Sequence, residues 1–379
     1  MRNSGHRFVC IDIFSLENRG DWLMLSSALE QIRSRLPGAS VCVPQHVFDR
    51  DRAIYKSMGI LPLASSRDLR RRFAERLRAL TGLRRRRVYP AEVDLILLAA
   101  GFRFSDQFGP MKDDAIEYEI GQYRRFCKKN RRFILLPQAF GPFETDCHRR
   151  RIRAICEMAD LVYAREETSR GHLEKALGES GKVRVAPDFT CLYNGEPREL
   201  PFGRGEYVVL VPNRQMITKT SLASNYCDFM VGIARMLVSR GERIVFLNHE
   251  SAPDDGLVDV FNASVDNAGA VVRNVSGGAC KTVLAGAKLV VTSRFHALVS
   301  ALAEGVPALC TSWSHKYQEL VSELGCPQSC IDVSDVASAI AKVESALHDP
   351  VPYTSPESAR SALRGRVEQM WNEVFAPFN

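Results

Sequence analysis

A strand–helix–strand pattern at residues 289–324 constrains the fold of this chain more than any other stretch. Leu289–Val291 is a short apolar run of the kind that forms a buried strand. Ala297–Ala303 carries small and apolar side chains that suit a helix packed on a sheet, and Val306–Thr311 is a second apolar run. Two such strands joined by one helix form a parallel pair with a right-handed crossover. The pattern therefore predicts an α/β protein with a parallel sheet.

Polar residues follow both strands of this pattern. Thr292 and Ser293 are candidate N-caps for the helix, and Gly305 stands where the helix should end. Four cationic or titratable residues come after the two strands: Arg294, His296, His315 and Lys316. Ligands of open α/β sheets bind beyond the carboxyl ends of the strands. We therefore expect a site for a small, doubly anionic substrate at this edge of the sheet.

Length and charge narrow the class of protein. A chain of 379 residues suits two domains, and 45% apolar and 25% charged residues are ordinary for a globular protein. The net charge of +7 suits an anionic substrate or surface, but it is too small to indicate nucleic acid as a partner. The sequence has neither an apolar run that could span a bilayer nor a signal-peptide pattern at its start. We expect a cytoplasmic protein, located in the cytosol or at the inner face of the membrane.

The cysteines indicate reduced thiols rather than a metal site. The 11 cysteines are scattered, and none of them forms a CxxC pair. Several stand in apolar runs, as buried thiols do in cytosolic proteins. We expect no bound metal.

A second group of polar residues follows the first predicted strand, Phe8–Phe14. Asn18, Gly20 and Asp21 lie between this strand and a helix that begins near Trp22. Gly20 allows a tight turn, and Asp21 stands where a helix N-terminus favours a carboxylate. A plain cap and turn explains these three residues equally well on local grounds.

Three further charged residues stand at predicted strand ends. Arg165 follows Leu161–Ala164, Asp188 follows Val183–Val185, and Arg214 comes after a third apolar run. Arg165 and Asp188, taken singly, could each also be a surface salt-bridge partner.

A polar segment at residues 193–204, rich in Gly, Pro and Glu, marks a domain boundary. We predict two Rossmann-like domains, residues 1–195 and 196–379, that face each other across a cleft. The chain has no intact GxGxxG motif, which disfavours a nicotinamide or flavin site. No cofactor is expected.

The segment 67–87 is strongly basic. Leu69, Phe73, Leu77 and Leu80 recur at helical spacing among arginines, and four consecutive arginines end the segment. Basic amphipathic helices of this kind lie on anionic membrane surfaces or bind polyanions. A solvated helix and linker on the outside of the domain is the alternative.

The strand-end residues of the two predicted domains would meet in the cleft. The first domain would supply Asn18, Asp21 and Arg165, and the second Arg214, Arg294, His296 and Lys316. Cations at helix starts bind phosphate and carboxylate groups, because guanidinium forks and backbone amides act together there. His296 is a candidate general acid or base, because histidine suits that role near neutral pH, whereas a histidine in that position could also simply face the core.

The order of these motifs resembles the polysaccharide pyruvyl transferase family, from residue 18 to about residue 325. The resemblance rests on Asn18-x-Gly20-Asp21, Val93–Asp106, Pro137–Pro142, Asp160–Ser169, Ala186-Pro187-Asp188, Thr292–Ala297, Gly305-Val306-Pro307 and Lys316. One departure is visible, since family members usually carry consecutive glycines where this chain has Ala99-Ala100-Gly101. Methyl groups there would narrow the approach of a ligand to the backbone.

The resemblance implies a GT-B-like fold and transfer of a pyruvyl group from phosphoenolpyruvate to two hydroxyls of a sugar, as a ketal. Phosphoenolpyruvate would be a substrate rather than a cofactor, with Arg294, Arg165 and Lys316 binding its anionic groups. His296 would protonate the methylene carbon, and Asp21 would orient or deprotonate the acceptor. The first domain would be the acceptor side, and the second the donor side with a closing C-terminal helix. The other expected substrate-binding residues are Asn18, Gly20, Arg214, Asp188 and His315.

The sequence is also compatible with two other functions. A GT-B glycosyltransferase that uses a nucleotide-sugar donor would share the architecture and the cationic site. A non-catalytic glycan-binding protein would share the scaffold. The expected partners are phosphoenolpyruvate, a saccharide acceptor that is free or lipid-linked, and an anionic membrane surface.

Overall fold

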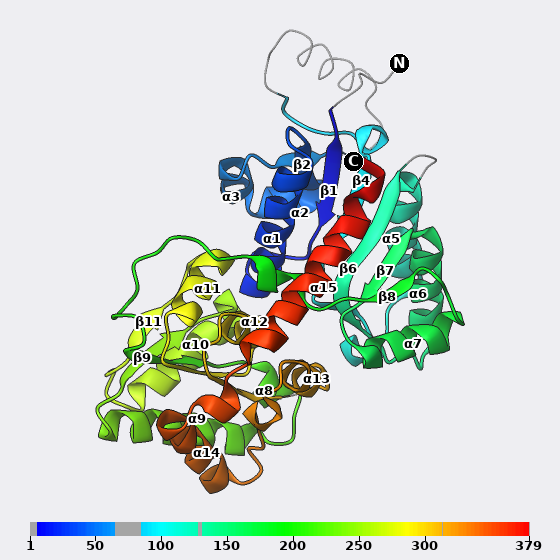
Figure 1. Cartoon of the computed structure of the whole chain (residues 1–379). Coiled ribbons are helices and arrows are strands. Elements are labelled where there is room, and N and C mark those ends of the chain that lie inside the picture. The colour runs from blue at the N-terminus through cyan, green and yellow to red at the C-terminus, as the bar shows by residue number, and fades with distance from the viewer. Residues whose placement is uncertain (1–5, 65–84, 128–130, 313, 379) are drawn as a thin grey trace. The chain divides into compact units, whose positions relative to one another are not determined.

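The computed structural model describes residues 6–64, 85–127, 131–312 and 314–378 and divides into two compact units (Figure 1). Unit 1 comprises Met1–Leu16, Ser27–Asp188 and Gln369–Asn379, and unit 2 comprises Glu17–Ser26 and Phe189–Glu368. Most of the basic segment 67–87 lies outside the described residues, as does Trp313. Contact between that segment and a membrane stays a prediction. Among the described residues, every helix is too short or too polar to cross a lipid bilayer.

Unit 1 is built on a parallel sheet with the strand order β3-β2-β1-β4-β6-β7-β8, and β5 pairs with β6 beside it. Its described strands are β1 (Phe8–Asp12), β2 (Ser40–Pro44), β3 (Leu61–Leu63), β4 (Leu95–Leu98), β5 (Phe102–Phe104), β6 (Arg132–Phe140), β7 (Leu161–Ala164) and β8 (Val183–Val185). Its described helices are α2 (Gln45–Arg50), α3 (Arg52–Ser57), α5 (Asp113–Phe126), α6 (Asp146–Met158) and α7 (Glu167–Leu177). Every residue of β4 is buried, as expected for a strand covered on both faces. Helix α7 packs on β6, β7 and β8, and α5 packs on α6.

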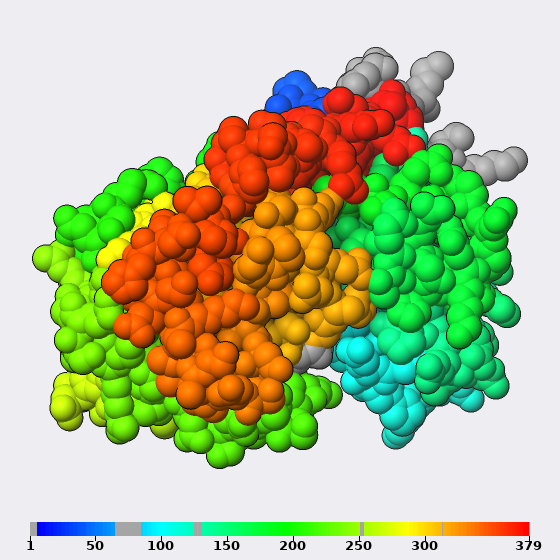
Figure 2. Space-filling model, turned by 60° about the horizontal axis from the view of Figure 1, so that its bottom comes forward, coloured from blue at the N-terminus to red at the C-terminus, as the bar shows by residue number. Residues whose placement is uncertain are grey.

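Unit 2 repeats the plan with a parallel sheet of order β11-β10-β9-β12-β13-β14. Its described strands are β9 (Tyr207–Val211), β10 (Arg243–Leu247), β11 (Ala270–Val272), β12 (Leu289–Thr292), β13 (Ala308–Thr311) and β14 (Cys330–Ile331). Its described helices are α8 (Gln215–Thr218), α9 (Ala223–Ser239), α10 (Ser251–Ala263), α11 (Gly277–Ala285), α12 (Phe295–Ala303), α13 (Lys316–Glu323) and α14 (Val336–His348). Helices α9 and α14 pack together, and Figure 2 shows α14 at the surface, in orange.

Two long helices are divided between the units. The first residues of α1 (Arg19–Arg35) belong to unit 2 and the rest to unit 1, and α15 (Glu357–Phe375) passes from unit 2 into unit 1 at Gln369. The units therefore differ from the predicted domains in three ways. The boundary between them falls after Asp188 rather than after residue 195. The segment Glu17–Ser26 belongs to unit 2, and the end of the last helix belongs to unit 1.

The predicted strand–helix–strand pattern at residues 289–324 is confirmed. Strands β12 and β13 are parallel neighbours with Val290 opposite Ala308, and α12 connects them. All residues of α12 are buried, because its small and apolar side chains are in contact with protein all round. The predicted N-caps were wrong, since Arg294 occupies the N-cap position without a side-chain cap.

The hydroxyls before α12 have a different role from capping. The Thr292 hydroxyl accepts a hydrogen bond from the Arg294 N–H at 2.9 Å. The Ser293 hydroxyl bonds to Tyr226 at 2.9 Å and to Thr311 at 2.7 Å. These bonds fix the turn that leads from β12 into α12.

The start of α11 approaches the start of α1 closely within unit 2. A Cβ atom at Gly277 would lie 2.6 Å from the carbonyl oxygen of Arg19 and 2.7 Å from the backbone nitrogen of Leu23. Both are main-chain atoms, which cannot move aside as the end of a long side chain can. Glycine is therefore needed at this position.

We expect Gly277→Ala to destabilise unit 2 by about 1–3 kcal/mol, the usual range for overpacking. The melting temperature, measured by circular dichroism, should fall by about 2–4 °C for each kcal/mol in a domain of this size. The matched control is Gly365→Ala, on an exposed turn of α15 where a Cβ meets nothing within 4 Å. Gly365→Ala should keep or slightly raise the melting temperature, because alanine favours helix. Equal melting temperatures in the two variants would contradict the close approach at Gly277.

Candidate functional site

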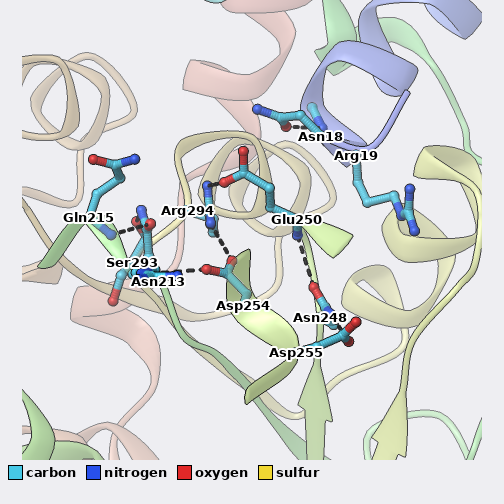
Figure 3. A network of polar contacts seen from close by, with 12 residues as sticks. Asn18, Arg19, Asn213, Gln215, Asn248, Glu250, Asp254, Asp255, Ser293 and Arg294 are labelled. Carbon is cyan, nitrogen blue, oxygen red and sulfur yellow. Dashed lines mark hydrogen bonds and ion pairs between the residues drawn. The ribbon is translucent and has the colours of Figure 1, made fainter. Parts of the chain in front are cut away.

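Polar residues gather where the central strands of unit 2 end (Figure 3). Strands β10, β9 and β12 are parallel neighbours, so their carboxyl ends share one edge of the sheet. The residues that follow these ends are Asn213 and Arg214 after β9, Asn248, His249 and Glu250 after β10, and Ser293, Arg294 and His296 after β12. This edge is the usual position of ligand sites in open parallel sheets.

Arg294 is the centre of a buried ionic network. Its Nε donates to Asp254 at 2.9 Å, its Nη2 contacts the same carboxylate, and its Nη1 forms an ion pair with Glu250. Arg294 is 8% exposed and Asp254 is fully buried. Burial would lower the pKa of Arg294, but the two carboxylates outweigh it and raise that pKa. Burial raises the pKa of Asp254, and Arg294 opposes this shift.

These contacts fix the direction of the Arg294 guanidinium. They engage three of its N–H groups among the described residues, and a guanidinium has five. The expected cationic residue is therefore present at the strand end, but its charge is already balanced by Asp254 and Glu250.

The segment that begins α1 is joined to this edge by backbone hydrogen bonds. Asn18 and Glu250 form an antiparallel bridge, and the Arg19 N–H donates to the carbonyl of His249 at 3.0 Å. The Asn18 side chain accepts the Gly20 N–H at 2.9 Å, so Asn18 does make the turn that was one of its two predicted roles. Asp21 lies buried in the first turn of α1.

Gly20 and His296 are in direct contact. A Cβ atom at position 20 would lie 2.2 Å from Nδ1 of His296. The His296 ring is buried in the first turn of α12 and also meets the Phe295 ring edge-on, with centroids 5.7 Å apart. The structure thus brings together two predicted site residues that are far apart in the sequence.

The two predicted site residues after β13 stand at the start of helix α13 (Lys316–Glu323), and not in a loop. Lys316 is the first residue of α13, is buried, and places its Nζ 5.4 Å from the centroid of the Phe295 ring. His315 is the half-buried N-cap residue of α13. The side chain of Arg214 is exposed, and its backbone N–H donates to Asp254 at 3.1 Å.

Arg165 and Asp188 belong to unit 1 and form a buried ion pair. The Arg165 Nη1 lies 3.3 Å from Asp188, and its Nε lies 3.4 Å from Glu166. The two strand-end charges are therefore salt-bridge partners of each other, but the pair is buried, whereas the simpler alternative placed such a partner at the surface. A place for Arg165 beside Arg294 stays a prediction.

Sequence reasoning missed three residues of this edge: His249, Glu250 and Asp254. His249 is 1% exposed, and neither of its ring nitrogens has a hydrogen-bond partner among the described residues. Burial, together with the charges of Arg294, His296 and Arg19, lowers the pKa of His249 well below its ordinary value. Its ring is therefore neutral at pH 7. The available signal was the polar run Asn248–Glu250 directly after an apolar strand.

Within the part of the chain that the structure describes, no group of three or more His, Cys, Asp or Glu side chains is arranged to hold a metal ion. The site consists of a cation paired with two carboxylates, and of histidines that lie at the same edge of the sheet.

Comparison with known sequences identifies one family. The family model described as polysaccharide pyruvyl transferase matches residues 18–315, which include Asn18, Arg294 and His296. A curated relative, the amylovoran biosynthesis protein AmsJ of Erwinia amylovora, is 21% identical over 303 residues. That match covers 73% of this chain and 70% of the relative.

Comparison with solved structures identifies the fold. The UDP-GlcNAc 2-epimerase of Neisseria meningitidis, solved with UDP-GlcNAc, aligns with a TM-score of 0.60 at 8% identity, over 98% of this chain and all 100% of the other. HepE of Anabaena, solved with UDP-glucose, aligns with a TM-score of 0.57 at 11% identity, over 98% of this chain and 99% of the other. Such low identities show the fold alone. The predicted fold class, a GT-B-like pair of Rossmann-like domains, is confirmed.

The neutral state of His249 predicts a pH dependence of stability. An unfolded histidine has a pKa of about 6.5, whereas the folded pKa is lower. Between these two values the unfolded chain binds a proton that the folded chain does not, so stability should fall as pH drops below about 6.5. We expect His249→Gln to show a smaller loss of melting temperature between pH 7.5 and pH 5.5 than the unsubstituted protein. The control is His46→Gln, at an exposed histidine, in which the melting temperature should fall as much as in the unsubstituted protein. An equally large fall in His249→Gln would contradict the prediction.

Proposed function

The chain belongs to the polysaccharide pyruvyl transferase family, and we propose that its donor is phosphoenolpyruvate and its product a pyruvyl ketal on a saccharide. The observation that carries the proposal is the placement of Arg294 and His296 at one edge of the unit 2 sheet, with His296 in contact with Gly20. Arg294 follows the buried strand β12, and His296 lies in the first turn of α12.

The proposed donor carries a carboxylate and a phosphate, which require cations and N–H donors. Arg294 offers a fork of fixed direction, suited to a carboxylate or phosphate. Glu250 is the partner of Arg294 that an incoming anion would displace, because the Glu250 side chain is 24% exposed and that of Asp254 is fully buried. Lys316 supplies a second positive charge at the start of α13.

The proposed reaction needs one proton donor and one proton acceptor. His296 gives a proton to the methylene carbon of phosphoenolpyruvate, which makes C2 electrophilic. A sugar hydroxyl bonds to C2, the bond from C2 to the phosphate oxygen breaks, and a neighbouring hydroxyl closes the ketal. The two sugar hydroxyls release two protons. One returns to His296 and replaces the proton that His296 gave to the new methyl group, and the other leaves with phosphate. Asp21 is proposed to orient or deprotonate the acceptor.

The identity of the donor is tested directly by product release. Incubation of the protein with saccharide acceptors and either phosphoenolpyruvate or UDP-glucose should release inorganic phosphate from the first and no UDP from the second. Mass spectrometry of the acceptor should show the added pyruvyl mass. Release of UDP without release of phosphate would instead establish a nucleotide-sugar glycosyltransferase, and binding without turnover would establish a non-catalytic glycan-binding protein.

The residue roles are tested by substitution. His296→Ala should lower kcat at least about 100-fold, in line with the contribution of a general acid. Arg294→Lys should raise KM for phosphoenolpyruvate more than it lowers kcat, because lysine keeps the charge but loses the fork. Lysine is preferred to alanine here, because alanine would leave Asp254 buried without its partner, at a cost of about 3–5 kcal/mol.

The exposed His46→Ala serves as the matched control and should retain the kcat and KM of the unsubstituted protein. A His296→Ala protein that is folded and has near-normal turnover would refute the assignment of His296 as the acid.

A further inference from the structure

Two pairs of cysteines stand directly opposite each other on neighbouring parallel strands. Cys310 on β13 is the register partner of Cys330 on β14, and Cys10 on β1 is the register partner of Cys42 on β2. Neighbouring strands lie about 4.8 Å apart, which is inside the range of about 4.4–6.8 Å between the Cα atoms of a disulfide. The backbone therefore allows a disulfide at both places, and all four thiols are free in the structure.

The sulfur atoms of Cys310 and Cys330 are already close. The two Sγ atoms lie 3.7 Å apart, which is within hydrogen-bonding distance for sulfur. Because the two residues are register partners, their side chains leave the sheet on the same face. A disulfide here requires the two sulfurs to approach each other, but no change in the pairing of the strands.

Access from solvent distinguishes the two pairs. Cys330 is half-buried, whereas Cys310, Cys10 and Cys42 are buried. Among the described residues, β14 is the last strand of the unit 2 sheet, whereas β1 and β2 each have a strand on either side. A reagent in solution can therefore reach the first pair through Cys330, and it has no such route to the second pair.

The surroundings of Cys330 also favour its reactive form. The hydrogen bond with Cys310 lowers the pKa of the Cys330 thiol, and the positive charge of Lys342 acts in the same direction, while burial opposes both. Lys342 is held beside Cys330, because its Nζ donates to the Cys330 carbonyl at 2.8 Å. The same hydrogen bond, together with burial, raises the pKa of Cys310. The thiolate is the nucleophile in thiol–disulfide exchange, so Cys330 should react first.

We propose that Cys310 and Cys330 form a redox-sensitive site, which a low-molecular-weight disulfide such as oxidised glutathione converts reversibly into a disulfide bond. The Cys330 sulfur bonds to one sulfur of oxidised glutathione, whose S–S bond breaks and releases one glutathione. The Cys310 sulfur then bonds to the Cys330 sulfur and displaces the second glutathione. The protons of the two protein thiols pass to the two glutathione thiols, so one disulfide is reduced for each one that forms.

The proposed bond would cross-link the edge strand β14 to the strand that supports the turn before Arg294. Thr311 directly follows Cys310 in β13, and the Thr311 hydroxyl bonds to that of Ser293 at 2.7 Å. The inference is independent of the proposed function, because none of its steps involves phosphoenolpyruvate or a saccharide.

Peptide mapping tests the site on the folded, full-length protein. The reduced protein is treated with oxidised glutathione, quenched in acid, unfolded and alkylated, and its unreduced digest is analysed by mass spectrometry. We expect a peptide pair linked through Cys310 and Cys330 that disappears after dithiothreitol treatment, with Cys10 and Cys42 fully alkylated. A link between Cys326 and Cys330, equally fast linkage of Cys10 to Cys42, or glutathione that stays on Cys330 without linkage to Cys310 would overturn the site.

Two matched variants test the order of reaction. Cys147 on α6 is also half-buried, and its hydrogen bond with Thr145 lowers its pKa. We expect Cys330→Ser to lower the rate at which Cys310 loses its free thiol at least about tenfold, and Cys147→Ser to change that rate less than about twofold. Circular dichroism establishes that each variant is folded. An unchanged rate at Cys310 in folded Cys330→Ser would contradict the proposal.

Discussion

The ligand edge of unit 2 depends on the neutralisation of one buried cation. Arg294 ends the turn after β12, and its partners are Glu250 after β10 and Asp254 in the first turn of α10. A buried guanidinium without partners would cost several kcal/mol in lost solvation, so all three elements must be in place for the edge to be stable. The Asp254 carboxylate also accepts the backbone N–H of Arg214 after β9. One carboxylate thereby ties the ends of the two central strands together.

The regular parts of this fold could be predicted because their signals are local. A buried strand appears in the sequence as an apolar run, and a crossover helix as a longer stretch of small and apolar residues. The β12–α12–β13 unit and its parallel pairing could therefore be predicted. Strand-end polar residues such as Arg294 and His296 were predictable for the same reason, since topology alone brings them to one edge. Asp254 was not predictable, because a single aspartate in a helix has no pattern that distinguishes a buried ion-pair partner from a solvated side chain.

The assignment of segments to units could not be predicted from the order of the chain. Asn18 and Arg19 follow the first strand of unit 1, yet their backbone pairs with Glu250 and His249 in unit 2. Similarly, the end of α15 belongs to unit 1, where Tyr163 donates a hydrogen bond to Glu373 at 2.6 Å. Backbone pairing of this kind joins residues that are far apart in the sequence. No local sequence pattern indicates which distant segment will supply the partner. Gly20 shows the same limit, because its turn was predictable from sequence but its contact with His296 was not.

The charges at this edge also constrain how an anionic donor would bind. Arg294 already has two carboxylate partners, so a donor anion would gain little by adding a third negative group to the same guanidinium. For the proposed donor we therefore expect exchange: the more exposed Glu250 would give way while the fully buried Asp254 stays, so that Arg294 is paired in both states. The guanidinium then never becomes an unpaired buried charge during binding. For the proposed donor, the attracting positive charge would come mainly from Lys316 and the exposed Arg214, and Arg294 would contribute direction rather than net charge.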